Sequence, residues 1–167
     1  MYKIQEVSKK EDFMLIQKLE HIMRKEDMKN GNMIQNINEV NINFLKDLPK
    51  GYFIFYKNEE IVGYLRIFAP TQFSRINFRY TLGPFFIISE FRGQGLGKIF
   101  LNMLFLNLEK KHPKKLLNIV LAVAEKNISA IKLYTSCGFT IFGEEQFHLK
   151  FQGKFQNALW MQKILNY

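Results

Sequence analysis

The sequence has a single cysteine and no long apolar run. With only Cys137, no intramolecular disulfide is possible, and the Cys clusters typical of structural zinc sites are missing, so we expect a reducing compartment and no metal. No run approaches the roughly 18 apolar residues that cross a bilayer, and residues 1–6 do not resemble a secretion signal. These absences exclude a disulfide scaffold and predict a cytoplasmic protein with no membrane partner.

The composition also lacks the low hydrophobicity of a disordered chain. Of the 167 residues, 47% are hydrophobic, and 17 of them are Phe. A chain of this length buries roughly two thirds of its unfolded surface when it folds. We therefore expect one domain that covers residues 1–167.

Acidic residues are too few to balance the basic ones. The 24 Lys and Arg against 15 Asp and Glu give a net charge of +9, which suits nucleic acid, an anionic cofactor or an acidic substrate. The lysines are scattered, however, and their densest cluster, residues 110–115, falls where a helix is expected to end. Because no helix-turn-helix and no aromatic-plus-basic motif accompanies the charge, nucleic acid is not favoured as a partner.

The spacing of apolar residues predicts a mixture of strands and helices. In the first half we expect a strand at 2–8, a helix at 11–24, a polar loop at 25–43, a short helix near 38–47, and hairpin strands at 51–56 and 61–67. In the second half we expect an irregular segment at 68–80, a strand at 82–89, a helix at 95–110, a strand at 116–123, a helix at 128–136, and hairpin strands at 139–149 and 155–164. The strand–helix–strand order around residue 100 predicts a parallel pair of strands.

A glycine-rich turn lies between the predicted fourth strand and the helix that follows it. Alternating glycines let the backbone turn sharply and point N–H groups outward, and the start of a helix adds its positive dipole end. Such a turn suits a phosphate or pyrophosphate, with Arg92 and Lys98 adding charge. A P-loop would need Gly in place of Arg92 and a dinucleotide fingerprint would need Gly in place of Lys98, so neither is favoured.

Two blocks of sequence resemble the GCN5-related N-acetyltransferase (GNAT) family. Arg92-Gly93-Gln94-Gly95-Leu96-Gly97 is similar to its Gln/Arg-x-x-Gly-x-Gly/Ala signature. Asn127 to Tyr134, followed by Cys137-Gly138-Phe139, is similar to its Asn-x-x-Ala-x-x-Leu-Tyr…Gly-Phe segment. The resemblance implies an α/β (α+β) fold: a mixed, strongly twisted sheet of about seven strands flanked by helices on both faces.

The resemblance also implies acetyl-CoA as the acyl donor and places it on this chain. The pantetheine arm would pair with the backbone of the fourth strand, in a cleft where the fourth and fifth strands separate. The implied donor-binding residues are Phe85, Phe86, Ile87, Arg92, Gly93, Gln94, Gly95, Leu96, Gly97, Lys98 and Asn127. Asn127 also stands where a helix N-cap is expected, which would explain it equally well.

Tyr134 is the catalytic residue that the resemblance implies. Asn127, Ile131 and Tyr134 share one face of the predicted helix, and the phenol would protonate the leaving CoA thiolate. An outward backbone N–H near Ile87 would stabilise the oxyanion that forms when the amine attacks. The alternative is that Tyr134 is an ordinary core tyrosine.

The general base has no assigned residue. Some members of the family carry a glutamate on the fifth strand, but the matching position here is Ala122. Glu125, Glu144, Glu145 and His148 are candidates, although their residue types favour an ordinary surface residue at each position.

Two further features are open to more than one interpretation. Cys137 has no His or carboxylate beside it in sequence, which favours a packing residue over a covalent nucleophile. The segment 68–80, with Phe73, Arg75, Phe78 and Arg79, either lines the acceptor pocket or forms a solvated turn.

The main hypothesis is acetyl transfer from acetyl-CoA to an amine of a small molecule, peptide or protein, by direct attack in a ternary complex. The alternative is a non-catalytic acyl-CoA-binding or regulatory module, which the missing fifth-strand glutamate would support. A homodimer through the C-terminal strands is also expected, with Trp160 either at its interface or in the core.

Overall fold

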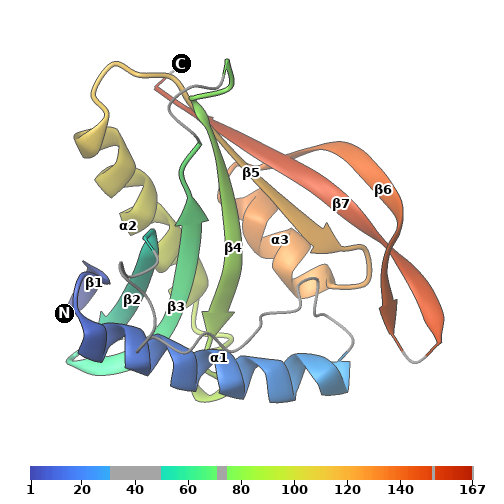
Figure 1. Cartoon of the computed structure of the whole chain (residues 1–167), viewed down its shortest axis with the longest axis horizontal. Coiled ribbons are helices and arrows are strands. Elements are labelled where there is room, and N and C mark those ends of the chain that lie inside the picture. The colour runs from blue at the N-terminus through green and yellow to red at the C-terminus, as the bar shows by residue number, and fades with distance from the viewer. Residues whose placement is uncertain (31–49, 71–74, 152, 167) are drawn as a thin grey trace.

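A seven-stranded sheet with three α-helices forms the domain (Figure 1). The computed structural model describes residues 1–30, 50–70, 75–151 and 153–166. The strands lie in the order β1-β2-β3-β4-β5-β7-β6. The elements are β1 (Tyr2–Glu6), α1 (Lys10–Asn30), β2 (Tyr52–Lys57), β3 (Glu60–Phe68), β4 (Arg79–Ile87), the 3-10 turn η2 (Ser89–Phe91), α2 (Leu96–Lys111), β5 (Leu117–Ala124), α3 (Ile128–Ser136), β6 (Thr140–Phe151) and β7 (Lys154–Leu165).

β4 and β5 are the parallel pair that the strand–helix–strand order predicts. Their register covers only Arg79–Thr81 against Asn118–Val120, while β5 pairs with β7 along its whole length. Beyond Thr81 the two strands diverge, as Figure 1 shows at the foot of β4. All other neighbouring strands are antiparallel.

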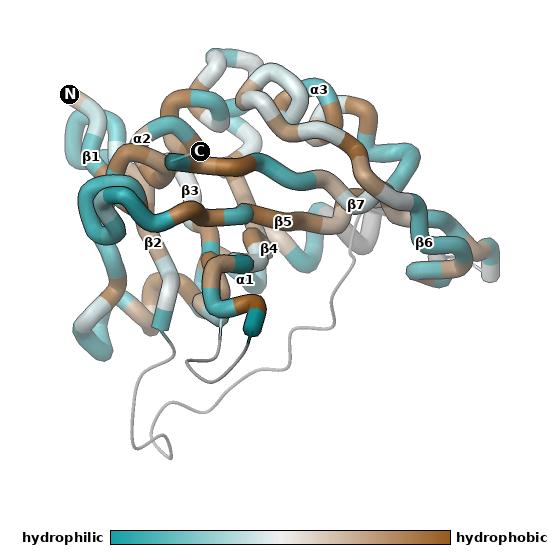
Figure 2. The backbone as a smooth tube through the Cα atoms, turned by 90° about the horizontal axis from the view of Figure 1, so that it is seen from above, coloured by the Kyte–Doolittle hydropathy of each residue, from teal (hydrophilic) through white to brown (hydrophobic). Residues whose placement is uncertain are grey.

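Helices cover both faces of the sheet, as the family resemblance implies (Figure 2). On one face, α2 and α3 pack on β2–β5, with Phe100, Leu101 and Leu104 fully buried. On the other face, α1 places Phe13 and Ile16 against the alternate residues of β2, β3 and β4. Burial of each such side chain contributes roughly 1.5–3 kcal/mol to the stability of the fold, so α1 and α2 are held on the sheet mainly by apolar packing.

The predicted elements are present, with some shifted ends. The prediction of a loop from residue 25 is wrong for residues 25–30, because α1 continues to Asn30. The residues of that stretch have ordinary helix propensity, and Glu26 is tied to another element, as described below. β4 begins earlier than predicted, at Arg79, and ends at Ile87. The helix predicted near 38–47 lies outside the described residues.

Three expectations concern the surface. Among the helices that the structure describes, none is long and apolar enough to cross a membrane. The described His, Cys, Asp and Glu side chains form no group that could hold a metal ion. Trp160 is half-buried and belongs to neither core, and its Nε1 donates to Glu145. The homodimer stays a prediction.

Candidate active site

The glycine turn joins β4 to α2 in the way that an anion site requires. Gly93 and Gly95 have φ values of 74° and 72°, a left-handed conformation that favours glycine. Gly95 is the N-cap of α2, and no side chain in the described part of the chain caps that helix start. A Cβ built at either glycine has no described atom within 4 Å, so the outer side of the turn is open. Backbone N–H groups and the helix dipole are therefore available to a phosphate.

Gly97 serves a different purpose from the two glycines before it. A Cβ at this position would lie 3.1 Å from Cδ2 of Leu133, on α3. The glycine lets α2 approach α3 closely, which places the two motif-bearing segments side by side. Leu96 is buried in the core, so it can offer a ligand only its backbone.

The charges at the turn differ from those expected. Lys98 is exposed at the start of α2, where its charge is available to the turn. The guanidinium of Arg92, in contrast, is turned back to the Ile87 carbonyl and to Glu26 on α1. Lys57, at the end of β2, brings a further cation to the turn, because its Nζ lies 3.2 Å from Oε1 of Gln94. The sequence did not reveal this contact. Gln94 in turn donates to the carbonyl of Glu90, at 3.1 Å.

The backbone of β4 presents alternate residues to the diverging β5. The N–H of Ile88 donates to the carbonyl of Val62, so the alternation of the antiparallel ladder turns the backbone groups of Ile87 and Phe85 away from β3. Those groups face the region where β4 and β5 separate, as a pantetheine arm would require. Phe86 pairs with Tyr64 in the ladder and buries its side chain on the α1 side. Its predicted contact with the donor is therefore not supported by the geometry.

Tyr134 lies on α3 against the same stretch of β4. Its ring centroid is 6.4 Å from that of Phe85 and 5.7 Å from that of Phe139. The side chain is buried, and burial, with a smaller contribution from Cys137, raises the pKa of the phenol above its usual value. The phenol thus stays protonated at neutral pH, as a proton donor must. Its burial equally fits the core-tyrosine alternative.

Asn127 has the capping role that its position in the sequence suggested. Its Oδ1 accepts from the backbone N–H of Ala130 at 3.2 Å and from Ser129 Oγ at 3.1 Å. Capping of this kind stabilises a helix by about 1 kcal/mol and explains Asn127 without a ligand. Ile131 packs against the same core as Tyr134, so the predicted common face is present.

Cys137 packs in the core as a small apolar residue. It is buried at the end of α3, and burial raises the pKa of its thiol above the usual value. A thiol with a raised pKa is a poor nucleophile at neutral pH. The structure thus favours the packing interpretation.

The candidate bases lie on two parts of the sheet: Glu125 directly follows β5, and the other three are on β6, which β7 separates from β5. Ala122 pairs with Trp160 on β7, and Trp160 Nε1 donates to Glu145 Oε2 at 2.9 Å. His148 Nδ1 lies 2.9 Å from the same oxygen. The hydrogen bond from Trp160, together with the nearby His148, lowers the pKa of Glu145, which weakens it as a base. Glu144 accepts from Asn157 at 2.6 Å.

The described part of the 68–80 segment lies away from these residues. Phe78 accepts a backbone hydrogen bond from Asn118, and Arg79 begins β4 where it pairs with β5. Along β4, Arg79 and Ile87 are separated by roughly 25 Å. Arg79 and Phe78 therefore do not line an acceptor pocket beside Ile87, and Phe73 lies outside the described residues.

Comparison with known proteins agrees with the fold and identifies the family. The model of the acetyltransferase (GNAT) family matches residues 16–139. The chain is 35% identical over 95 residues to the spermine/spermidine N(1)-acetyltransferase of Bacillus subtilis (strain 168), a match that covers 56% of this chain and 61% of that protein. A probable spermine N(1)-acetyltransferase from Bacillus subtilis subsp. natto matches equally well. The chain thus aligns with less than two thirds of these relatives' length.

Solved structures share the whole fold at low sequence identity. The ribosomal-protein-S18-alanine N-acetyltransferase of Escherichia coli has a TM-score of 0.73 and 18% identity, covering 100% of this chain and 96% of that one. The spermidine N-acetyltransferase of Vibrio cholerae, in complex with CoA and spermine, has a TM-score of 0.73 and 17% identity, with coverages of 98% and 95%. The family match spans most of the chain and includes both motif blocks, and on this basis the chain belongs to the acetyltransferase (GNAT) family.

Proposed function

We propose that the chain is an N-acetyltransferase that transfers the acetyl group of acetyl-CoA to a primary amine in a ternary complex. The observation that carries this proposal is the open glycine turn at the uncapped start of α2, beside the diverging end of β4. Membership of the acetyltransferase family supports the same reaction.

The residues present fit acetyl-CoA as the donor. A Cβ at Gly93 or Gly95 would point into open space, where the backbone N–H groups of the turn can hold the pyrophosphate. Lys98 and Lys57 add positive charge on either side of the turn. Phe85 offers the backbone groups that face away from β3 to the pantetheine amides, while the carbonyl of Ile87 already accepts from Arg92.

Two groups of this chain would act on the reacting atoms. Bound acetyl-CoA supplies a thioester that an amine can attack. The N–H of Ile87 stabilises the negative charge on the carbonyl oxygen, because it is fixed in the sheet and needs no reorganisation. Tyr134 gives its Oη proton to the departing sulfur, because a phenol is protonated at neutral pH and its ring lies against Phe85 on β4.

For the acceptor we propose a polyamine such as spermidine or spermine. The Bacillus subtilis relatives are named for these amines, and the Vibrio cholerae structure was solved with spermine. Carboxylates of this chain also gather beside Trp160, with Glu145 bonded to its indole and Glu144 close by on β6. Carboxylates and an aromatic ring suit a polycation, although the net charge of the chain is +9.

The test is a steady-state assay of CoA release with a panel of amines. The panel holds spermidine, spermine, a lysine-containing peptide and a peptide with an N-terminal alanine. We expect turnover with acetyl-CoA and a kcat/KM for spermidine or spermine at least tenfold above that for either peptide. Preference for a peptide would overturn the polyamine proposal alone. Binding of acetyl-CoA without acetylation of any amine would favour the non-catalytic module.

A further inference from the structure

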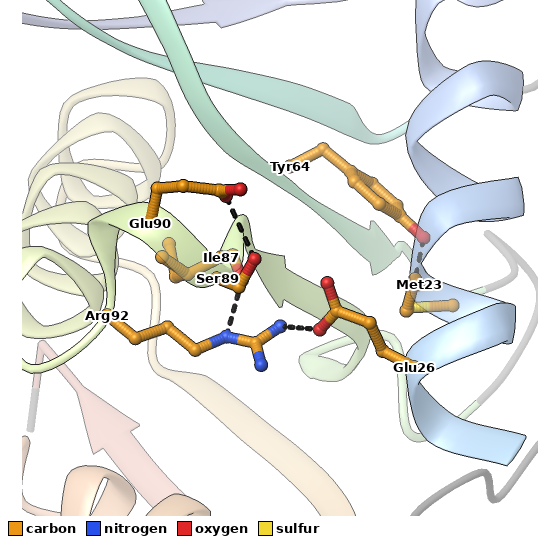
Figure 3. A network of polar contacts seen from close by, with 7 residues as sticks. All are labelled: Met23, Glu26, Tyr64, Ile87, Ser89, Glu90 and Arg92. Carbon is orange, nitrogen blue, oxygen red and sulfur yellow. Dashed lines mark hydrogen bonds and ion pairs between the residues drawn. The ribbon is translucent and has the colours of Figure 1, made fainter. Parts of the chain in front are cut away.

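Arg92 belongs to the glycine turn, but its guanidinium is held on the face of the sheet that α1 covers (Figure 3). Nε donates to the carbonyl of Ile87 at 2.7 Å, and Nη2 pairs with Glu26. Cζ lies 5.3 Å from the centre of the Phe86 ring, which is buried in the α1-side core. Partners on two elements therefore fix the guanidinium on this face.

The C-terminal half of α1 contacts β3 and the glycine turn at two successive helical turns. Tyr64 Oη donates to Met23 Sδ at 3.2 Å, and the Tyr64 ring lies 6.1 Å from that of Phe86. Glu26 follows Met23 by one helical turn on the same face, where it meets Arg92. Figure 3 shows both contacts, one from Tyr64 on β3 to Met23 and one from Arg92 in the glycine turn to Glu26.

The two substrates of the proposed reaction would approach from opposite faces. The glycine turn leads into α2, so a pyrophosphate held there lies on the face that α2 and α3 cover. An amine that attacks a thioester beside Ile87 would then come from the other side of the sheet, the side on which α1 lies. Arg92 holds the carbonyl of Ile87 from that second face.

We infer that Glu26 and Arg92 form a positioning pair for the amine side of the reaction, rather than a pyrophosphate contact. The pair fixes the end of α1 and the Ile87 peptide relative to each other, so that the amine meets the thioester in the correct geometry. This inference rests on the proposed function and names two residues of the same site.

Arginine suits this role in a way that lysine does not. The planar guanidinium donates at once to the Ile87 carbonyl and to the Glu26 carboxylate, whereas an ammonium is a single point charge. A phosphate contact would accept either residue as a cation. The substitution Arg92→Lys therefore separates the two roles.

The experiment measures Glu26→Gln, Arg92→Lys and the double variant by acetyl-CoA calorimetry, by amine kinetics and by amide exchange in α1. We expect acetyl-CoA affinity within about twofold of wild type, because the donor-binding backbone is unchanged. We expect kcat/KM for the amine to fall roughly tenfold, since small misplacements are costly in catalysis. The double variant should lose no more than either single variant, as expected for one coupled pair.

The matched control is Glu6→Gln, which breaks another exposed ion pair, with Lys111 on α2. This pair joins β1 to α2 away from the glycine turn, so its loss should leave acetyl-CoA affinity, amine kinetics and exchange in α1 unchanged. In contrast, Glu26→Gln and Arg92→Lys should speed amide exchange in the last turns of α1. That readout needs no catalytic activity.

A tenfold loss of acetyl-CoA affinity in Arg92→Lys, with unchanged amine kinetics, would overturn the inference. Unchanged amide exchange in α1 in both single variants would overturn it as well. Failure of the proposed function has a different signature, in which the wild-type protein itself neither binds acetyl-CoA nor acetylates any amine.

Discussion

The two faces of the sheet differ in their chemistry. Under α2 and α3 the core is almost wholly apolar, and its polar atoms are few, such as the hydroxyls of Tyr80 and Tyr134. Under α1, Glu20 is only 7% exposed and accepts a hydrogen bond from Tyr52 at 3.0 Å. Arg66 stacks on the Tyr52 ring, with 4.7 Å between Cζ and the ring centre. The proposed donor side therefore relies on backbone and packing, and the α1 side on charged side chains.

This difference fits the division of the proposed reaction. A donor common to a family can be held by glycines and backbone groups, which leave little trace in side-chain chemistry. An acceptor that differs between relatives needs charged or hydrogen-bonding side chains for discrimination. Substitutions on each face can test whether the two faces carry these separate tasks.

The largest effect should come from Tyr134→Phe, on the donor face. The ring can still pack between Phe85 and Phe139, so the fold should be retained. Without the phenolic proton, kcat should fall about 100-fold or more, as is typical for loss of a general acid. Acetyl-CoA affinity by calorimetry should stay within about twofold. Unchanged turnover would remove Tyr134 from the mechanism.

On the α1 face, Tyr52→Phe should affect stability. The substitution removes the hydroxyl that donates a hydrogen bond to the Glu20 carboxylate. Leaving a buried carboxylate without that bond costs about 1–3 kcal/mol of stability. Burial and the nearby Glu20 raise the pKa of Tyr52 to about 12, so the hydroxyl is a donor throughout the neutral range. Denaturant unfolding measures the loss. A variant as stable as wild type would contradict the account of this face.

Gly95→Ala should produce a smaller loss of stability on the donor face. An alanine at φ 72° costs about 1–2 kcal/mol, and its methyl group would project into the space proposed for the pyrophosphate. Acetyl-CoA affinity should fall roughly tenfold, which corresponds to about 1.4 kcal/mol. The control is Gly97→Ala, which meets Leu133 and gains helix propensity, so stability should change by less than about 1 kcal/mol. Equal effects on affinity would contradict separate roles for the two glycines.

The smallest effect should be the pH dependence that Glu20 contributes. Burial raises the pKa of Glu20 above its ordinary value of 4.5, so the folded state binds this proton more tightly than the unfolded state. Wild-type stability should therefore fall, relative to Glu20→Gln, as pH rises from the ordinary pKa to the raised one. Above that window the difference should be constant. Thermal unfolding of both proteins between pH 4 and 8 measures it, and a wild-type stability that rises with pH relative to Glu20→Gln would contradict the burial of this carboxylate.

Local patterns allowed much of the fold to be predicted, and long-range contacts explain what was missed. The strand, glycine turn and helix around residues 79–111 follow from hydrophobic periodicity and from glycines that adopt positive φ. The partners of Arg92 could not be predicted, because Glu26 lies 66 residues away in sequence. The contact between Lys57 and Gln94 depends in the same way on how the β2–β3 hairpin meets the turn. The continuation of α1 to Asn30 also depends on such contacts.

The most direct test of the account is a calorimetric titration of the protein with acetyl-CoA, with NAD, ATP and dephospho-CoA as controls. The account predicts micromolar or tighter binding of acetyl-CoA and no comparable binding of NAD or ATP, because the turn lacks the glycines of their loops. Absence of any heat or thermal stabilisation with acetyl-CoA, or equal binding of NAD, would contradict a donor site at the glycine turn.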